Sequence, residues 1–227
     1  MGSIRLPGKT LMQLNGETML SSLLKQLKYS KLLNRKIIAT TTNSEDDILE
    51  NFTKSNNIEL FRGSANDVLD RYYQCAKSFS LSHIVRITAD NPLLDPEILD
   101  MVIASYKEGN YDYVNNFTKR TFPYGTEVEI FSFHVLEKVW KNAKTLYDRE
   151  HVTSYIYNNP NEFTSKCIEY NVDYSYLHWT VDRIEDLKLV QIILSKIKKR
   201  PVLMNDIIEL FSKEPNLIKI NANTSKN

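Results

Sequence analysis

Short runs of apolar and β-branched residues alternate along the chain with segments in which apolar residues recur at helical spacing. The runs predict strands at residues 36–42, 58–61, 83–88, 111–116 and 127–131. Strands that alternate with helices in this way usually form a parallel sheet covered by the helices. The pattern therefore predicts an α/β fold with a mostly parallel sheet.

Four of the helix-period segments carry a start or stop signal. Ser44 and Ser64 each precede such a segment and could cap it, and Asp95 does the same with a proline directly after it. Near the end, residues 187–197 form one apolar face that stops before Pro201. We expect helices after each of these caps and another helix ahead of the proline.

The size of the chain favours a single domain. It has 227 residues, of which 42% are hydrophobic, enough for one substantial core. No linker or repeat interrupts residues 1–220, and residues 221–227 read as a polar tail. We therefore expect one domain over 1–220, followed by that tail.

Charge and cysteine content exclude several classes of protein. Lys plus Arg number 29 against 28 Asp plus Glu, so no general attraction for nucleic acid or an anionic membrane is expected. Cys75 and Cys167 have neither metal-ligand nor disulfide-framework spacing. No signal peptide or membrane-length apolar run is visible. A cytoplasmic protein without nucleic-acid or membrane partners is the expectation.

The opening residues form a glycine-bearing basic loop with no strand ahead of it. Backbone N–H groups around Gly2 and Gly8 could surround phosphate oxygens, with positive charge from Arg5 and Lys9. An ordinary basic turn is the alternative. Small and basic side chains bury too little surface to fix a loop. We therefore expect a further segment to precede Met1.

Two aspartates stand where α/β proteins place ligands. Asp90 comes just after a predicted buried strand, and Asp182 follows a short apolar run before a helix. Either could bind a metal ion. The alternatives are a turn former for Asp90 and a helix N-cap for Asp182.

Six short motifs follow one another along the chain. They are Arg-Leu-Pro-Gly-Lys, Ala-Thr-Thr-Thr-Asn, Phe-Arg-Gly-Ser with Asp-Val-Leu-Asp-Arg-Tyr, Arg-Ile-Thr-Ala-Asp-Asn-Pro-Leu, Arg-Glu-His-Val-Thr and Trp-Thr-Val-Asp. Together, over residues 2–210, the set resembles the spore-coat polysaccharide type of cytidylyltransferase, which is similar to the CMP-sialic acid and CMP-KDO synthetases.

The resemblance implies a Rossmann-like nucleotidyltransferase fold, here with its first strand absent. It also implies an enzyme that uses CTP and Mg²⁺, transfers CMP to the hydroxyl of an acidic or amino sugar and releases pyrophosphate. Surface polysaccharide or glycan synthesis is the expected setting, and a homodimer the expected assembly.

The resemblance also assigns roles, residue by residue. Arg5 and Lys9 would hold the triphosphate beside Gly2 and Ser3, and Asp90 and Asp182 would bind the metal. Residues facing the nucleoside would be Thr40, Thr41, Arg62, Gly63, Ser64 and Arg71. Residues near the acceptor sugar would be Glu127, Glu129, Arg149 and His151.

Alternatives stay open for the acceptor residues. The two glutamates, alternating onto one face of a strand, could read sugar hydroxyls or amines, or be exposed glutamates of an edge strand. His151 could accept the acceptor's proton or be a structural hydrogen-bonding residue at a helix start.

The chain departs from the family pattern at its start. Relatives carry an apolar strand ending in Gln-Ala-Arg before the Gly-Ser region, and Met1 stands where the residue after that arginine would be. We expect either an internal methionine of a longer reading frame or an inactive fragment. Two other functions compete: a GT-A-like glycosyltransferase that uses a nucleotide sugar, although no Asp-x-Asp stands at a predicted strand end, and a non-catalytic nucleotide-binding subunit.

Overall fold

The computed structural model of the protein describes residues 5–222. Its strands are β1 (Gln13–Leu14), β2 (Glu17–Thr18), β3 (Ile37–Thr41), β4 (Glu59–Gly63), β5 (His83–Arg86), β6 (Tyr113–Asn115), β7 (Glu129–Ser132) and β8 (Ser165–Cys167). The five predicted strands correspond to β3, β4, β5, β6 and β7.

Helices alternate with these strands, as the pattern predicted. The α-helices are α1 (Met19–Leu27), α2 (Ile48–Asn56), α3 (Val68–Ser78), α4 (Pro96–Glu108), α5 (Phe133–Asn142), α6 (Leu146–His151), α7 (Ser154–Asn158), α8 (Ile184–Lys196) and α9 (Met204–Lys213). The 3₁₀ helices are η1 (Lys9–Leu11), η2 (Ser44–Asp46) and η3 (Pro215–Ile220). No helix within residues 5–222 is both long and apolar enough to span a membrane.

Most of the strands in the main sheet run in one direction. In the order β5-β7-β6-β8, β6 pairs in parallel with β8, and β7 is antiparallel to both β5 and β6. Strands β5, β6 and β8 therefore share a direction that β7 opposes. A second parallel ladder joins β3 to β4, and β1 and β2 form a short hairpin. The α/β fold is confirmed.

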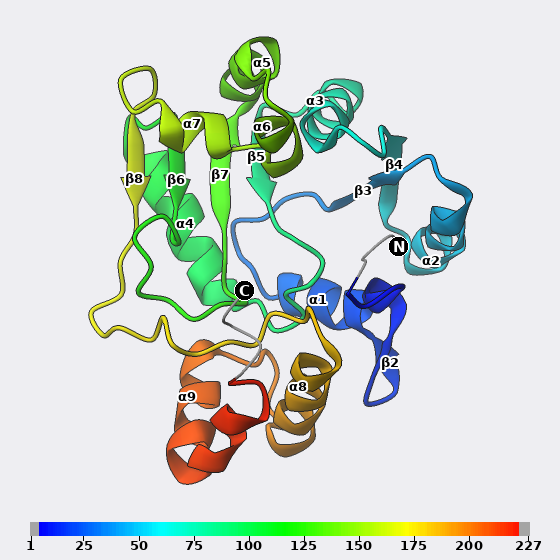
Figure 1. Ribbon diagram of the computed structural model, residues 1–227, viewed down its shortest axis with the longest axis vertical. Helices are drawn as coiled ribbons and strands as arrows, with labels where there is room; N and C mark the ends of the chain where they lie inside the picture. The colour runs from blue at the N-terminus through cyan, green and yellow to red at the C-terminus, as the bar shows by residue number, and fades with distance from the viewer. Residues whose placement is uncertain (1–4, 223–227) are drawn as a thin grey trace.

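The four-stranded main sheet and the β3–β4 ladder are not joined to each other within the described residues. Strand β3 pairs only with β4, and β5 only with β7. Figure 1 shows β8, β6, β7 and β5 side by side, with β3 and β4 beyond β5. The free edges of β3 and β5 are places where a further strand could extend either ladder. The expectation of a segment before Met1 concerns chain outside the described residues and stays a prediction.

Two of the predicted helix caps are wrong in detail. The residue that caps α3 is Asp67, whose carboxylate accepts the N–H of Asp70 at 2.8 Å, while the Ser64 hydroxyl accepts the N–H of Asp67 one turn earlier. Ser44 begins η2, and α2 starts only at Ile48. Both serines lie one short turn ahead of the helix they were expected to cap.

The other two helix predictions are confirmed. Asp95 caps α4 through bonds from the N–H groups of Glu97 and Ile98, with a proline at the first helical position. Helix α8 buries Leu187, Val190, Ile193 and Leu194 and ends before Pro201.

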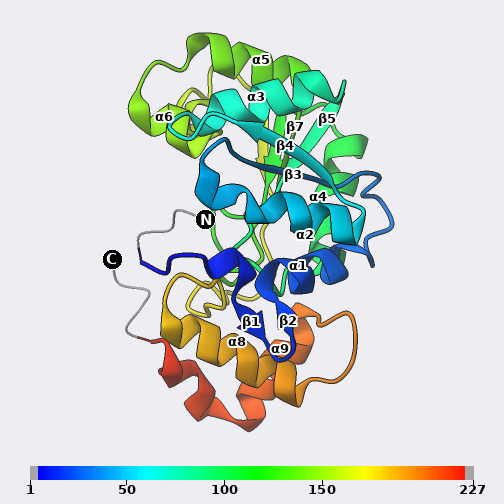
Figure 2. The same ribbon diagram turned by 90° about the vertical axis from the view of Figure 1, so that its right-hand side faces the viewer.

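The hydrophobic core lies in layers on the two sides of the sheet and beneath it. One cluster joins α3 and α5 to β5 and β7, and another joins α1 and α4 to β6 and β7. A third, around the fully buried Trp179, packs α8 and α9 against the chain start. Figures 1 and 2 show α8 and α9 together below the sheet, next to α1 and the β1–β2 hairpin. The carboxyl end of β5 leads toward this lower layer.

The predicted division at residue 220 stays a prediction. Asn221, which it assigns to the polar tail, is 4% exposed and donates to the His178 carbonyl and the Asp186 carboxylate. The remainder of that tail, 223–227, lies outside the described residues.

Candidate active site

Two loops that are far apart in the sequence meet beneath the sheet. The first leaves β5 and carries Asp90, and the second precedes α8 and carries Asp182. They are joined directly, because the Val181 N–H donates to the Asp90 carbonyl at 2.8 Å. This backbone bond places the two aspartates side by side, as the family resemblance implies.

Asp182 is not the N-cap of α8. The cap residue is Arg183, and the carboxylate of Asp186 accepts the N–H groups of Asp182 and Arg183 at 3.0 and 2.9 Å. Asp186 is fully buried and takes a further bond from the Asn221 amide at 2.9 Å. Asp186 thus satisfies the helix start, which leaves the Asp182 carboxylate available to other groups.

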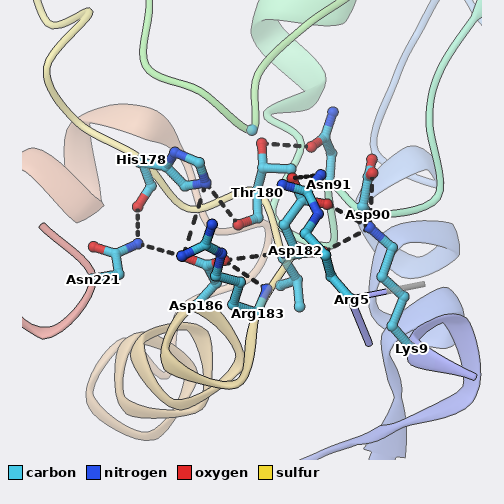
Figure 3. Close-up of polar contacts among 12 residues, drawn as sticks. Arg5, Lys9, Asp90, Asn91, His178, Thr180, Asp182, Arg183, Asp186 and Asn221 are labelled. Atoms are coloured by element: carbon cyan, nitrogen blue, oxygen red, sulfur yellow. Dashed lines mark hydrogen bonds and ion pairs between the residues drawn. The ribbon is translucent and has the colours of Figure 1, made fainter. Parts of the chain in front are cut away.

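Lys9 lies between the two aspartates (Figure 3). Its Nζ donates to Asp90 Oδ2 at 3.1 Å, to Asp182 Oδ1 at 2.8 Å and to the Val181 carbonyl at 2.9 Å. Gly8, with a left-handed φ of 69°, forms the turn that begins η1 and so directs Lys9 inward. The exposed Arg5 adds a bond from Nη2 to Asp182 Oδ2 at 3.1 Å.

The charges in this cluster stabilise one another. Burial alone would lower the pKa of Lys9, but the neighbouring carboxylates outweigh it and the pKa is raised above its ordinary value. For Asp182, burial would raise the pKa, and the bond and charge of Lys9, with the charge of Arg5, lower it instead. The lysine is therefore an ammonium and Asp182 a carboxylate at neutral pH.

A chain of polar contacts extends from the aspartates toward the segment before β7. The Thr180 hydroxyl donates to Asn91 Oδ1 at 3.0 Å, and the Asn91 amide donates to Glu127 Oε2 at 3.2 Å. Glu127 also accepts from Arg120 at 2.7 Å. Of the four predicted acceptor residues, Glu127 is the one that these contacts connect to Asp90 and Asp182.

A glycine allows this segment to approach the second aspartate loop. Gly125 has a φ of +107°, and a Cβ there would lie 2.5 Å from the Trp179 ring and 2.9 Å from the Thr180 nitrogen. The Tyr124 N–H and carbonyl pair with Leu177 and Trp179 on either side. Only a glycine combines this backbone conformation with such close contact.

The predicted nucleoside-facing threonines hold an aspartate that we did not predict. The hydroxyls of Thr40 and Thr41 each donate to Asp46 Oδ2 at 2.6 Å, and the Thr41 N–H adds a bond of 2.9 Å. Burial would raise the pKa of Asp46, but hydrogen bonds, those from Thr40 and Thr41 among them, lower it well below its usual range. Only the spacing from Thr41 to Asp46 could have signalled this contact.

Arg62 is bound to the same region of the chain. Its guanidinium forms ion pairs with Asp47 at 2.7 Å and Glu50 at 2.6 Å and donates to the carbonyls of Thr41 and Asn43. It therefore ties the end of β3 to the start of α2. In this state its positive charge is already balanced by two carboxylates.

Gly63, Ser64 and Arg71 are packed together at the end of β4. A Cβ on Gly63 would lie 2.7 Å from the Phe61 ring and 3.1 Å from Arg71 Cγ. Arg71 Nη1 donates to the Ser64 carbonyl at 2.5 Å, while its Nε is buried without a partner. Burial lowers the pKa of Arg71. An unpaired buried donor of this kind is costly, and a ligand oxygen could satisfy it.

Glu129 and Arg149, two of the other predicted acceptor residues, are bound to side chains outside the Asp90–Asp182 cluster. Glu129 is 2% exposed and is bound by Arg86 and, at 2.6 Å, by the Tyr113 hydroxyl. The alternative of an exposed edge strand is wrong for Glu129, because β7 pairs on both sides. Arg149 donates to Asp67 at 2.8 and 2.5 Å and to the Trp140 carbonyl, which fixes the start of α3.

His151 is exposed at the end of α6, with its ring 4.2 Å from that of Tyr147. Among the described contacts, neither His151 nor Arg149 touches Asp90 or Asp182. Gly2 and Ser3 lie outside the described residues, so their predicted place beside the triphosphate stays a prediction.

The residues at this site fit a magnesium ion. The donor set consists of carboxylate and carbonyl oxygens, which are the ligands that Mg²⁺ prefers. Asp90 Oδ1 is buried and has no hydrogen-bond partner. No group of three His, Cys, Asp or Glu side chains with metal-site geometry occurs within residues 5–222. Proteins nevertheless usually bind Mg²⁺ through only one or two carboxylates when substrate phosphates supply the other ligands.

Comparison with known proteins decides the family. The cytidylyltransferase family model matches residues 1–222, which is nearly the whole chain. The chain belongs to the cytidylyltransferase family. Its sequence is 33% identical, over 95% of this chain and 92% of the relative, to the spore coat polysaccharide biosynthesis protein SpsF of Bacillus subtilis.

Two further similarities extend over the same length. An uncharacterised protein of Methanocaldococcus jannaschii is 40% identical over 98% of this chain and 91% of its own. A solved structure of a cytidylyltransferase from Leptospira borgpetersenii has 34% sequence identity and a TM-score of 0.92, covering 96% of this chain and 92% of that one. The resemblance inferred from the six motifs is confirmed.

Proposed function

We propose that this cytidylyltransferase transfers CMP from CTP to a hydroxyl of an acidic or amino sugar and releases pyrophosphate. The sugar class follows from the resemblance to CMP-sialic acid and CMP-KDO synthetases. The product would serve surface polysaccharide or glycan synthesis, which is consistent with the similarity to a spore coat polysaccharide protein. The observation that carries the proposal is the convergence of Asp90 and Asp182 beside Lys9 and Arg5.

The reaction requires little covalent chemistry from the protein. A sugar oxygen forms a new bond to the α-phosphorus, the bond from that phosphorus to the bridging oxygen breaks, and pyrophosphate leaves with the electron pair. The hydroxyl proton passes to solvent. Such a displacement depends on positioning and on stabilising negative charge. Arg5 and Lys9 supply positive charge on the side of the first loop.

Asp90 and Asp182 would hold Mg²⁺. The ion would neutralise charge that develops on the transferred phosphoryl group. The fixed distance between the two loops, set by the Val181–Asp90 backbone bond, keeps both carboxylates in place for this role. Arg71, with its unpaired Nε, would bind a nucleotide oxygen.

Glu127 would orient the acceptor. It is connected to Asp90 through the amide of the next residue, Asn91, and its second oxygen is held by Arg120 at 2.7 Å. A carboxylate fixed in this way accepts hydrogen bonds from sugar hydroxyls or an amine without having to be reordered. The buried Glu129, and Arg149, which is bound to Asp67, would act only by shaping this surface.

Pyrophosphate release tests the proposal. CTP and Mg²⁺ are incubated with a panel of acidic, amino and neutral sugars, and pyrophosphate is measured with a coupled assay. Release with CTP and one acidic or amino sugar, but not with UTP, is expected. Consumption of a UDP-sugar without pyrophosphate would indicate a glycosyltransferase instead, and binding of CTP without any turnover a non-catalytic subunit.

A further inference from the structure

Lys9 has no N–H group left for a phosphate in the structure described here. A lysine ammonium has three donors and no acceptor. Here three acceptors lie within hydrogen-bond distance: Asp90, Asp182 and the Val181 carbonyl. If Lys9 is to hold a triphosphate, as the proposed function requires, it must first give up at least one of these partners.

The ammonium also occupies the position at which a cation would bind. It contacts one oxygen of each carboxylate, and its side chain is only 13% exposed, so solvent screens the contact little. A divalent ion that uses the same two carboxylates would meet a fixed positive charge. Like charges at such short range repel strongly in a partly buried site.

We infer that Lys9 is a resident cation that holds the two aspartates together without nucleotide and makes metal binding depend on CTP. This inference rests on the proposed function and deepens it. The phosphates of CTP offer Lys9 new acceptors and counter-charge, which draws its Nζ away from Asp90 and Asp182. The carboxylates are then free for the divalent ion, with Asp90 Oδ1, buried and unpaired, as an additional ligand oxygen.

The consequence is a positive coupling between the two ligands. Because coupling is reciprocal, CTP raises the affinity for the metal by the same factor by which the metal raises the affinity for CTP. Removing the charge of Lys9 should reduce this coupling, since the carboxylates are then free at all times, and the part that remains would come from phosphate oxygens that bind the ion directly.

Manganese binding provides a direct test that does not depend on activity. Mn²⁺ is titrated into the full chain, and free Mn²⁺ is measured by its electron paramagnetic resonance signal. Without nucleotide, Lys9→Met is expected to bind Mn²⁺ at least about 10-fold more tightly than wild type. Lys9→Arg keeps the charge and should stay close to wild type. Lys188→Met is the matched control, because it removes one positive charge from an exposed position on α8.

The same titration is repeated with α,β-methylene CTP, which is not cleaved. Wild type should gain Mn²⁺ affinity by about 10-fold or more, and Lys9→Met should gain clearly less. Thermal melting with and without Mn²⁺ checks folding, and Lys9→Gln, which is neutral but retains a donor, is used if the methionine variant does not fold. Equal nucleotide-free affinity in wild type and the neutral variant would overturn the inference.

The remaining outcomes separate this inference from the proposed function. Absence of Mn²⁺ binding in every protein, with or without the analogue, would remove the metal site and the inference together. Tighter binding by Lys9→Met in an enzyme that releases no pyrophosphate with any sugar would sustain the role of Lys9 and overturn the proposed reaction.

Discussion

The two halves of the site differ in what their polar residues contact. Around Asp90 and Asp182, side chains converge on a position between two loops, and one buried carboxylate oxygen remains without a partner. Around β3, β4 and α3, most of the polar side chains that match family motifs are bound to other parts of the protein: Thr40 and Thr41 to Asp46, Arg62 to Glu50.

The difference shows that a motif can persist for two reasons. Under the proposed function, one set of residues would contact ligands, and the other would shape the surface on which the ligand lies. Side chains of the first kind affect turnover when they are replaced, whereas those of the second kind affect stability. The predictions below test whether replacing a given residue affects turnover or stability.

The largest effect is expected from the aspartate pair. Asp90→Asn and Asp182→Asn each remove a charge at the centre of the site and should reduce the rate of pyrophosphate release by about 10²-fold or more. Each variant should still fold, since asparagine keeps the shape of the side chain, but loss of an ion pair with the partly buried Lys9 should lower the thermal midpoint. Asp173→Asn, at an exposed position, is the control and should retain full activity. A near-normal rate in either variant would exclude that aspartate from the chemistry.

Gly125 tests how far the site depends on close packing. Gly125→Ala should lower the free energy of unfolding by about 1–3 kcal/mol, because its Cβ would overlap the Trp179 ring and the Thr180 backbone. Gly16→Ala is a matched control, since Gly16 also has a positive φ, +97°, but has open space around it. It should cost about 1 kcal/mol or less. Equal losses in urea unfolding would show that backbone conformation alone requires the glycine.

The sequence predicted the arrangement around Asp90 and Asp182 better than the arrangement around β3, β4 and α3. The strand-end position of Asp90 marked it as a candidate ligand, and the resemblance to the cytidylyltransferases, not local geometry, paired it with Asp182, which follows no strand. The partners of Arg62 and Arg149 come from other elements, and nothing local to either arginine reveals Glu50 or Asp67.

The sequence also did not reveal which charged residues would be buried. Glu129 alternates with apolar residues as an exposed strand residue would, but β7 lies between β5 and β6, so its carboxylate is buried and bound by Arg86. Asp186, which satisfies the start of α8, has the spacing of a capping box, three residues after Arg183, but neither residue is of the type that such a box usually carries.

Asp46 belongs to the half of the site around β3, β4 and α3, and the pH dependence of stability tests its role there. Hydrogen bonds, those from Thr40 and Thr41 among them, lower its pKa in the folded state. Its contribution to stability is therefore complete above about pH 4 and is lost as the pH falls further toward the folded value. Asp46→Asn should therefore be less stable than wild type at pH 7, and the difference should shrink in urea unfolding at pH 3. A constant difference across this range would assign the stabilisation to shape rather than to charge.

The smallest effect is expected from His151, the one predicted acceptor residue that is exposed and contacts a neighbouring ring. His151→Gln should change the free energy of unfolding by no more than about 0.5 kcal/mol and the rate of pyrophosphate release by less than about twofold. Arg149→Lys is the comparison. It removes the two hydrogen bonds that the guanidinium donates to Asp67 and should cost about 1–3 kcal/mol of stability. A loss of rate in His151→Gln with its stability unchanged would instead place the imidazole at the acceptor, since no structural role would produce that combination.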